Sequence, residues 1–192
     1  MYVKGSLILD YVSIIRANRD RKWGRYLEPK DWDIINGKIF PCIRYPVDSF
    51  RRIGFAIFRE IFKSDLQTAR SFGRSNMKTL LRIYPDSFLV PGDPLESVKR
   101  FVMSRRTMIG DGSDAGVIEH RDGRARIKIV MAPDEDDRER AGAFCYQYAG
   151  NLEELVRQAG GEDIAAIVRR RRRAFEIMVK WEQKDKTPMP PR

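Results

Sequence analysis

Apolar residues in the last third of the chain recur first at the spacing of a helix and then at the spacing of strands. The first set lies at steps of three and four, which places its members on one helix face: Phe144, Tyr148, Leu152, Leu155 and Ala159. Gly160 and Gly161 follow, and a residue without a Cβ suits the left-handed cap that ends many helices. Apolar residues then alternate over 164–168 and 175–181, the period of half-buried strands. This stretch predicts a helix followed by two strands.

A hairpin is predicted before this helix. Residues 117–121 and 124–131 flank Asp122-Gly123, a dipeptide that favours a tight type I′ turn, and apolar residues alternate with polar ones in the second of the two segments. The order after residue 110 is therefore strand, strand, helix, strand, strand. This order predicts an α+β fold with a four-stranded antiparallel sheet and one crossover helix.

The chain before residue 110 shows the spacing of helices. Apolar positions and capping residues predict helices at 5–18, 29–36, 46–62, 65–84 and 93–106. Ser64 is expected to cap the fourth of these helices and Asp93 the fifth. The prediction is a single domain over 1–183, in which a helical part (1–106) packs on the sheet and its crossover helix (114–183).

The composition is that of a soluble domain with a substantial core. The 192 residues are 42% hydrophobic and 33% charged. Cys42 and Cys145 lie far apart outside any CxxC pattern, which argues against a disulfide framework or a zinc site and for a cytoplasmic protein. The apolar run 6–15 is too short to span a bilayer, and no signal-peptide cleavage site follows it. The tail 184–192 is expected to be disordered.

Positive charge is concentrated in the first part of the chain. The net charge is +10, and residues 1–110 hold 21 of the 37 Lys and Arg but 11 of the 27 Asp and Glu. Four basic residues follow at i, i+4 steps on the predicted helix 65–84: Arg70, Arg74, Lys78 and Arg82. Like charges at this spacing destabilise a helix by about 0.2–0.5 kcal/mol per pair. This basic stripe suggests an anionic partner, such as a phosphate, a nucleic acid or an acidic protein face; alternatively, acids elsewhere in the fold supply its counter-charges.

A second basic run lies at the predicted turn between the last two strands and includes Arg171, Arg172 and Arg173. Guanidinium groups at this hairpin tip are suited to phosphates or carboxylates. The alternative is a charged hairpin that resists pairing edge to edge with another sheet.

Four residues are candidates for lining a ligand pocket: Trp23, Trp32, Cys145 and Tyr148. The two tryptophans belong to an irregular segment and alternatively cover the core. The cysteine is alternatively a small buried hydrophobe.

No residue set predicts catalysis or metal binding. The single histidine, His120, falls in a predicted strand, and the sequence lacks GxSxG, Walker A and GxGxxG motifs. The Gly/Asp-rich segment 110–114 lacks the closing Glu of an EF-hand and is interpreted as a turn. We therefore expect a protein that is not an enzyme and that holds no metal or cofactor.

The C-terminal part resembles haem–nitric-oxide-binding and 4-vinyl-reductase-type domains, with Golgi-tethering TRAPP subunits as distant relatives. The resemblance lies in AFCYQYAGNLEELVRQAGGEDIAAIV and the later RRAFEIMVKWE: an aromatic helix, a Gly-Gly pair and two strands. The whole chain, from MYVKGSLILDYVSIIRANRD onward, also resembles an uncharacterised bacterial paralogous family of about this size. The resemblance implies helices packed on an α/β part, often a homodimer, with a small-molecule pocket or a protein-binding face.

Two features depart from the haem-binding members of this group. The resemblance implies an axial histidine on a helix and a YxSxR motif that holds the haem propionates. Here His120 falls in a strand, and YPDSF at Tyr84 lacks the arginine. The first hypothesis is therefore a sensory or adaptor module without haem that binds a partner protein or a small apolar ligand. The second is an anion- or nucleic-acid-binding protein that uses the two basic segments.

Overall fold

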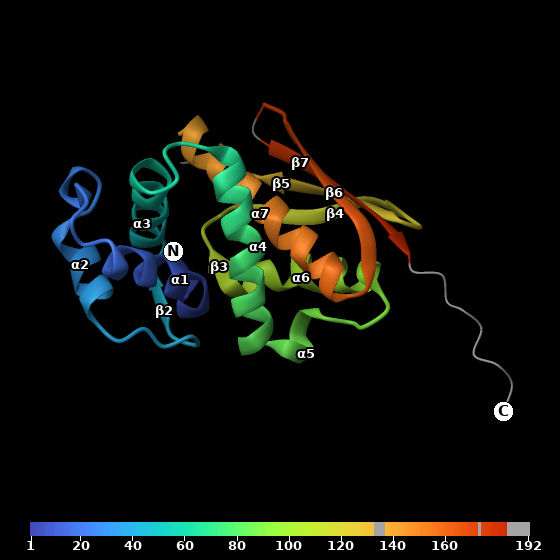
Figure 1. The fold of residues 1–192 in the computed structure, drawn as a ribbon, viewed down its shortest axis with the longest axis horizontal. Helices are drawn as coiled ribbons and strands as arrows, with labels where there is room; N and C mark the ends of the chain where they lie inside the picture. Colours follow the sequence, from blue (N-terminus) through green and yellow to red (C-terminus); the bar gives the residue numbers. More distant parts are fainter. Residues whose placement is uncertain (133–136, 173, 184–192) are drawn as a thin grey trace, which may run out of the picture.

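The computed structural model describes residues 1–132, 137–172 and 174–183 (Figure 1). Helices dominate the N-terminal side of the molecule, and a twisted sheet occupies the other side, with α4, α6 and α7 between them. The architecture is α+β, as the sequence predicts. The tail 184–192, which is expected to be disordered, lies outside the described residues.

The larger sheet is built from two hairpins joined by one helix. The first hairpin is β4 (Asp114–Arg121) with β5 (Arg124–Val130), and the second is β6 (Gly161–Arg170) with β7 (Ala174–Gln183). The connection between them is α7 (Arg138–Gln158). The strand order is β4-β5-β7-β6 and each neighbouring pair is antiparallel. This confirms the predicted sheet and its crossover helix.

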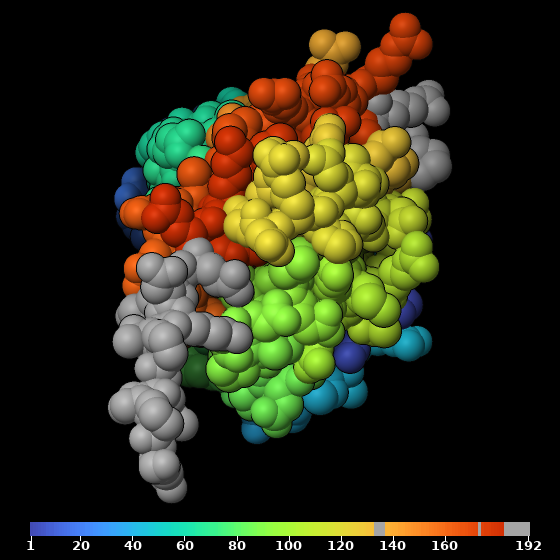
Figure 2. Space-filling view, turned by 90° about the vertical axis from the view of Figure 1, so that its right-hand side faces the viewer, coloured from blue at the N-terminus to red at the C-terminus, as the bar shows by residue number. Residues whose placement is uncertain are grey.

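Strand alternation decides which face of this sheet is buried. Ile127 on β5 and Ile177 on β7 are register partners, and both are fully buried. Leu152 and Leu155 of α7 are also fully buried, and α7 packs on β6 and β7. In Figure 2 the hairpin of β4 and β5 (yellow) lies between the segment around α6 (green) and the last strands (orange to red). This hairpin is therefore the part of the sheet that contacts α6 of the helical part.

Six helices precede the larger sheet, and five of them lie within a few residues of the predicted ranges. These are α1 (Gly5–Ala17), α2 (Pro29–Asn36), α3 (Val47–Glu60), α4 (Leu66–Ile83) and α6 (Pro94–Met108). The sixth, α5 (Pro85–Phe88), is a single turn between two of the predicted helices.

Helix α4 begins with a different cap from the predicted one. Asp65 accepts hydrogen bonds from the backbone N–H groups of Gln67 at 3.1 Å and Thr68 at 2.8 Å. Ser64 instead has φ +59, so its backbone is left-handed rather than extended as a cap requires. The prediction that Ser64 caps this helix was wrong, because Asp65 satisfies the same orphan donors from one position further on.

A second, smaller sheet was not predicted. It consists of β1 (Tyr2–Lys4), β2 (Arg44–Pro46) and β3 (Ile109–Gly110), in the order β2-β1-β3. Strands of two or three residues are too short to show alternation in a sequence. This sheet ties the chain start to the end of α6.

Helices α4 and α7 cross with their backbones in contact. A Cβ added to Gly73 of α4 would overlap the carbonyl oxygen of Gln147, and one added to Gly150 of α7 would overlap the carbonyl oxygen of Arg70. Glycine at both positions is therefore required for this packing. The sequence places Gly73 on the buried side of its helix, but the partner helix is known only from the structure.

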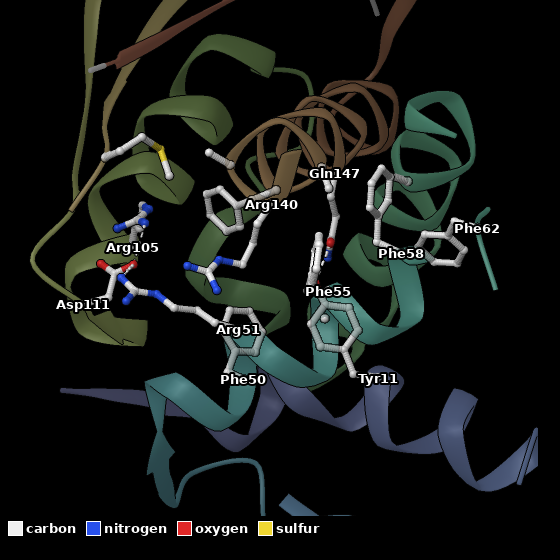
Figure 3. A pocket seen from close by; sticks show the side chains of 16 residues that line it. Tyr11, Phe50, Arg51, Phe55, Phe58, Phe62, Arg105, Asp111, Arg140 and Gln147 are labelled. Atoms are coloured by element: carbon white, nitrogen blue, oxygen red, sulfur yellow. Dashed lines mark hydrogen bonds and ion pairs between the residues drawn. The ribbon is translucent and has the colours of Figure 1, made fainter. Parts of the chain in front are cut away.

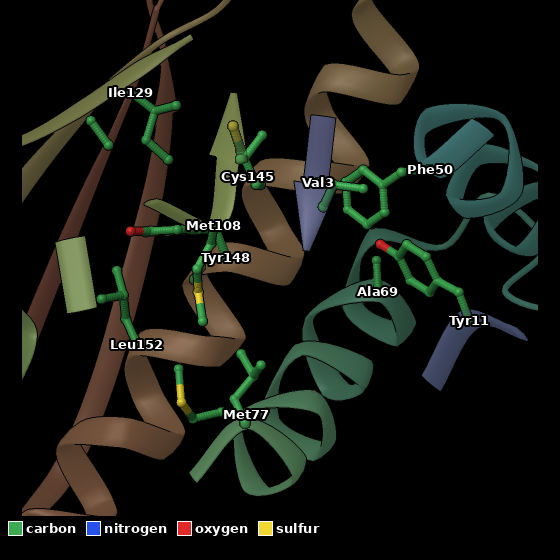
Figure 4. Close-up of a cluster of buried hydrophobic side chains, with 14 of the residues drawn as sticks. Val3, Tyr11, Phe50, Ala69, Met77, Met108, Ile129, Cys145, Tyr148 and Leu152 are labelled. Carbon is green, nitrogen blue, oxygen red and sulfur yellow. The ribbon is translucent and has the colours of Figure 1, made fainter. Parts of the chain in front are cut away.

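The buried side chains form one continuous core. Figure 4 follows it from Tyr11 and Phe50 in the N-terminal helices, past Met77 of α4 and Tyr148 of α7, to Ile129 in the sheet. None of the helices that the structure describes is long and apolar enough to cross a bilayer.

Candidate functional site

A cavity of about 60 Å³ lies between the N-terminal helices α1 and α3 and the start of α7 (Figure 3). The end of α6 and the turn that follows it close one side of the cavity. Aromatic rings form much of the wall: Tyr11, Phe50, Phe55, Phe58, Phe62 and Phe144. The wall thus combines residues from segments that are far apart in the sequence.

Stacked rings occupy the apolar side. The ring of Tyr11 lies between Phe50 and Phe72, with centroid distances of 5.3 Å and 5.4 Å. Its hydroxyl donates a hydrogen bond of 2.6 Å to Oε1 of Gln147 on α7. Burial raises the pKa of Tyr11, and the nearby charge of Asp10 acts in the same direction. Tyr11 therefore stays protonated and acts as a hydrogen-bond donor.

The opposite side is polar. Figure 3 shows the guanidinium groups of Arg51, Arg105 and Arg140 there, together with the carboxylate of Asp111. Asp111 Oδ2 lies 3.6 Å from Nη2 of Arg105 and 3.8 Å from Nη2 of Arg51. Both distances suit ion pairs but exceed hydrogen-bond length. Asp111 is held instead by Ser113, whose backbone N–H donates to Oδ1 at 2.9 Å.

Arg105 is the most deeply buried charge in this wall. Its side chain is 4% exposed. Nη2 donates to Oγ of Ser113, Nη1 lies 3.5 Å from the carbonyl oxygen of Ser113, and Nε is buried without a hydrogen-bond partner among the described residues. The guanidinium carbon lies 5.6 Å from the ring centre of Phe144. The site thus holds a buried cation whose donors are only partly satisfied.

The candidate residues from the sequence did not include Arg105, although a signal for it exists. Val98, Phe101 and Val102 form the buried side of α6, and Arg105 follows Phe101 by four positions. A charged residue on the apolar face of a helix is unusual, because charged side chains are seldom fully buried. The next residue, Arg106, is exposed, as is typical of arginine. This pattern was available from the sequence.

A second cavity of about 40 Å³ adjoins the first and shares Phe50, Phe144 and Gln147 with it. The hydroxyl of Tyr148 and Oδ1 of Asn151 are buried in its wall without hydrogen-bond partners among the described residues. Burial also raises the pKa of Tyr148. The structure therefore places one pocket candidate, Tyr148, at a cavity with unsatisfied polar atoms.

The other three pocket candidates lie elsewhere. Trp23 is 1% exposed, and its Nε1 donates to the carbonyl oxygen of Asn18 at 2.7 Å. Trp32 is half-buried against the core. Cys145 is buried and does not line either cavity, and burial raises the pKa of its thiol. The cysteine is therefore a protonated core residue.

The basic stripe on α4 divides into two halves. Arg70 donates from Nε and Nη2 to Glu153 of α7, the first bond being 3.0 Å, and Arg74 Nη1 donates to the same carboxylate at 2.8 Å. Lys78 and Arg82 are exposed. The acid that balances the first half thus comes from a helix about eighty residues away in sequence.

The arginine-rich hairpin is exposed where the structure describes it. Arg171 lies 3.3 Å from both carboxylate oxygens of Glu176, which lowers the pKa of Glu176, and Arg172 is exposed. Arg173 lies outside the described residues. His120 is exposed on β4. In the described ranges, no group of three or more acidic, histidine or cysteine side chains is placed to hold a metal ion.

The residues around the two cavities do not fit a haem. Their walls contain no histidine. A volume of about 60 Å³ is much less than a porphyrin requires. The stacked rings of Tyr11, Phe50 and Phe72 occupy the interior instead.

No protein-family model matches the sequence, and no curated protein matches it significantly. Solved structures do match the fold. The Fe(II) unliganded H-NOX protein from K. algicida superposes with a TM-score of 0.67 and 10% identity, over 95% of this chain and 98% of that one. A variant of T. Tengcongensis H-NOX gives 0.57 and 13%, over 93% and 97%. A structure from a study of haem distortion in the H-NOX family gives 0.60 and 14%, over 98% of both chains. Across nearly its whole length, this chain has an H-NOX-like fold.

Proposed function

We propose that this protein is a non-enzymatic sensory or adaptor module that binds a small apolar ligand, without haem, between its N-terminal helices and α7. The observation that carries the proposal is the cavity of about 60 Å³, with aromatic rings on one side and a few polar groups on the other. Ligand sites in proteins commonly combine an apolar wall with a small number of orienting polar groups.

The position of the cavity supports a sensory role. Its wall joins α1 and α3 to α6 and α7, so a bound ligand contacts both the helical part and the helix that lies on the sheet. A ligand shifts a conformational equilibrium only if it interacts differently with the two states. If the two states differ in the distance between the helical part and α7, a ligand bound between them contacts its site differently in each state.

Haem binding is not expected, because the cavity wall lacks histidine and aromatic rings occupy the interior. We expect purified protein to show no Soret absorbance. A stoichiometric Soret band after purification from haem-replete cells would contradict this part of the proposal.

Filling the cavity should abolish ligand binding. Ala143 lies in the wall on α7, and Ala143→Leu adds three carbon atoms that overlap the space for a ligand. Overpacking of this kind costs about 1–3 kcal/mol of stability, so the variant is expected to remain folded. The measurement is mass spectrometry of small molecules that copurify with the protein, which should be retained by the wild type and lost from the variant.

The matched control is Ser75→Leu, which introduces the same side chain on the exposed side of α4. It should retain the copurifying ligand. Equal ligand content in both variants would show that the cavity is not the binding site.

The anion- or nucleic-acid-binding hypothesis stays a prediction. It is weakened by the engagement of Arg70 and Arg74 with Glu153, and it now depends on Lys78 and Arg82 with the hairpin arginines. Binding to nucleic acid that falls steeply with salt would support it.

The predicted homodimer also remains a prediction, and light scattering of the purified protein measures it directly.

A further inference from the structure

We propose that the ligand of this cavity is a small carboxylate with a short apolar body, and that Arg105 binds its carboxylate group. The inference rests on the proposed ligand-binding function and adds a chemical class to it. Three features carry it: the burial of Arg105, the arrangement of polar and apolar groups around the cavity, and the size of the space.

The buried charge of Arg105 is only partly compensated by its surroundings. A charge removed from water is tolerated when its hydrogen bonds are satisfied and an opposite charge lies close to it. Here the side chain is 4% exposed, its Nε has no partner among the described residues, and Asp111 stays beyond hydrogen-bond distance at 3.6 Å. A ligand carboxylate beside Arg105 would supply the missing acceptor and add a second negative charge to that of Asp111.

The shape of the guanidinium favours a carboxylate. Nε and an Nη group of arginine point in the same direction and match the two oxygen atoms of a carboxylate. Ser113 and Asp111 hold the other edge of Arg105, because Nη2 donates to Ser113 and Ser113 in turn donates to Asp111. The arginine is therefore oriented before any ligand binds.

The apolar wall begins next to this cation. The ring of Phe144 lies 5.6 Å from the guanidinium carbon, and Figure 3 shows Phe58 and Phe62 at the far end of the cavity. A ligand with its carboxylate at Arg105 would direct its carbon chain toward these rings. A fully polar anion would make no favourable contact with these rings.

The volume limits the apolar body to a short one. The cavity holds about 60 Å³, and the further 40 Å³ lies behind Phe50, Phe144 and Gln147. Butyrate is therefore the aliphatic probe and benzoate the aromatic probe. Their neutral counterparts, butyramide and benzamide, have nearly the same shape without the charge.

The experiment measures the dissociation constants of the four probes by NMR titration of the full chain. Wild-type protein should bind at least one carboxylate about tenfold to a hundredfold more tightly than its amide, the ratio expected for a charge-assisted hydrogen-bonded contact. Arg105→Met keeps an unbranched side chain and removes the charge, so it should abolish this preference. Arg105→Lys should retain part of it.

Arg106→Met is the matched control, because Arg106 is the next residue on α6 and its side chain is 72% exposed. It should keep the wild-type preference. Equal binding of a carboxylate and its amide by the wild type would overturn the inference but leave the ligand-binding function in place. No binding of any probe would count against both. If Arg105→Met does not fold, the wild-type comparison decides alone.

Discussion

Replacing Gly150 by alanine should lower the free energy of unfolding by about 3 kcal/mol, the upper part of the range for overpacked sites. The new Cβ would overlap the carbonyl oxygen of Arg70 on α4. A backbone atom in a regular helix cannot turn aside as a side chain can, so the two helices must separate. Separation exposes the apolar residues between them. Chemical denaturation monitored by circular dichroism measures the change.

The same substitution at Gly142 gives the control. Gly142 also lies within α7, but the nearest atom to an added Cβ is a side-chain carbon of Leu66 at 4.0 Å. Alanine is favoured over glycine inside a helix, so Gly142→Ala should raise stability by about 0.5–1 kcal/mol. A loss of stability at Gly150 and a gain at Gly142 would show that the close contact of α4 and α7 causes the loss. Similar stability of the two variants would refute the close contact of α4 and α7.

Glu153→Gln should destabilise the protein by about 3 kcal/mol, as expected when one member of a buried charge network is neutralised. The carboxylate of Glu153 is 9% exposed and accepts hydrogen bonds from Arg70, from Arg74 and from the backbone N–H of Ala166 on β6. Glutamine has nearly the same shape but removes the negative charge that both arginines contact. Thermal and denaturant unfolding should both show the loss.

Glu96→Gln provides the comparison. Glu96 pairs with Arg100 one turn further along α6, and both side chains are more than 40% exposed. Surface pairs of this kind contribute about 0–1 kcal/mol. A loss at Glu153 no larger than the loss at Glu96 would mean that the network does not stabilise the fold.

The secondary structure was largely predictable because periodicity is a local property. The helical spacing in α7 and the Asp122-Gly123 turn were sufficient to predict the sheet and its crossover helix. The strands β1, β2 and β3 were not predictable, since three residues or fewer carry no recognisable alternation. Tertiary pairing, not sequence pattern, produces that sheet.

The site was less predictable, because its parts come from distant segments. The basic stripe was recognised, but its acid could not be assigned. That acid is Glu153 of α7, which accepts a hydrogen bond from Arg70 of α4. The cavity requires the relative positions of α1, α3, α6 and α7, which no periodicity contains. Tyr148 was a candidate from the aromatic face of its helix, and Arg105 had left a signal as a charge on an apolar helix face.

The crossing of α4 and α7 joins a helix of the predicted helical part to the helix that lies on the sheet. Helix α4 packs more extensively on α7 than any other helix does, and its packing on α3 is slight. Between α3 and α4, the non-glycine residues Lys63 and Ser64 both have left-handed backbones. We therefore expect α4 to move with the sheet, and α1–α3 to move as one unit about the junction at Lys63 and Ser64. Amide hydrogen exchange should show α1–α3 opening as one unit while α4 and α7 remain protected together.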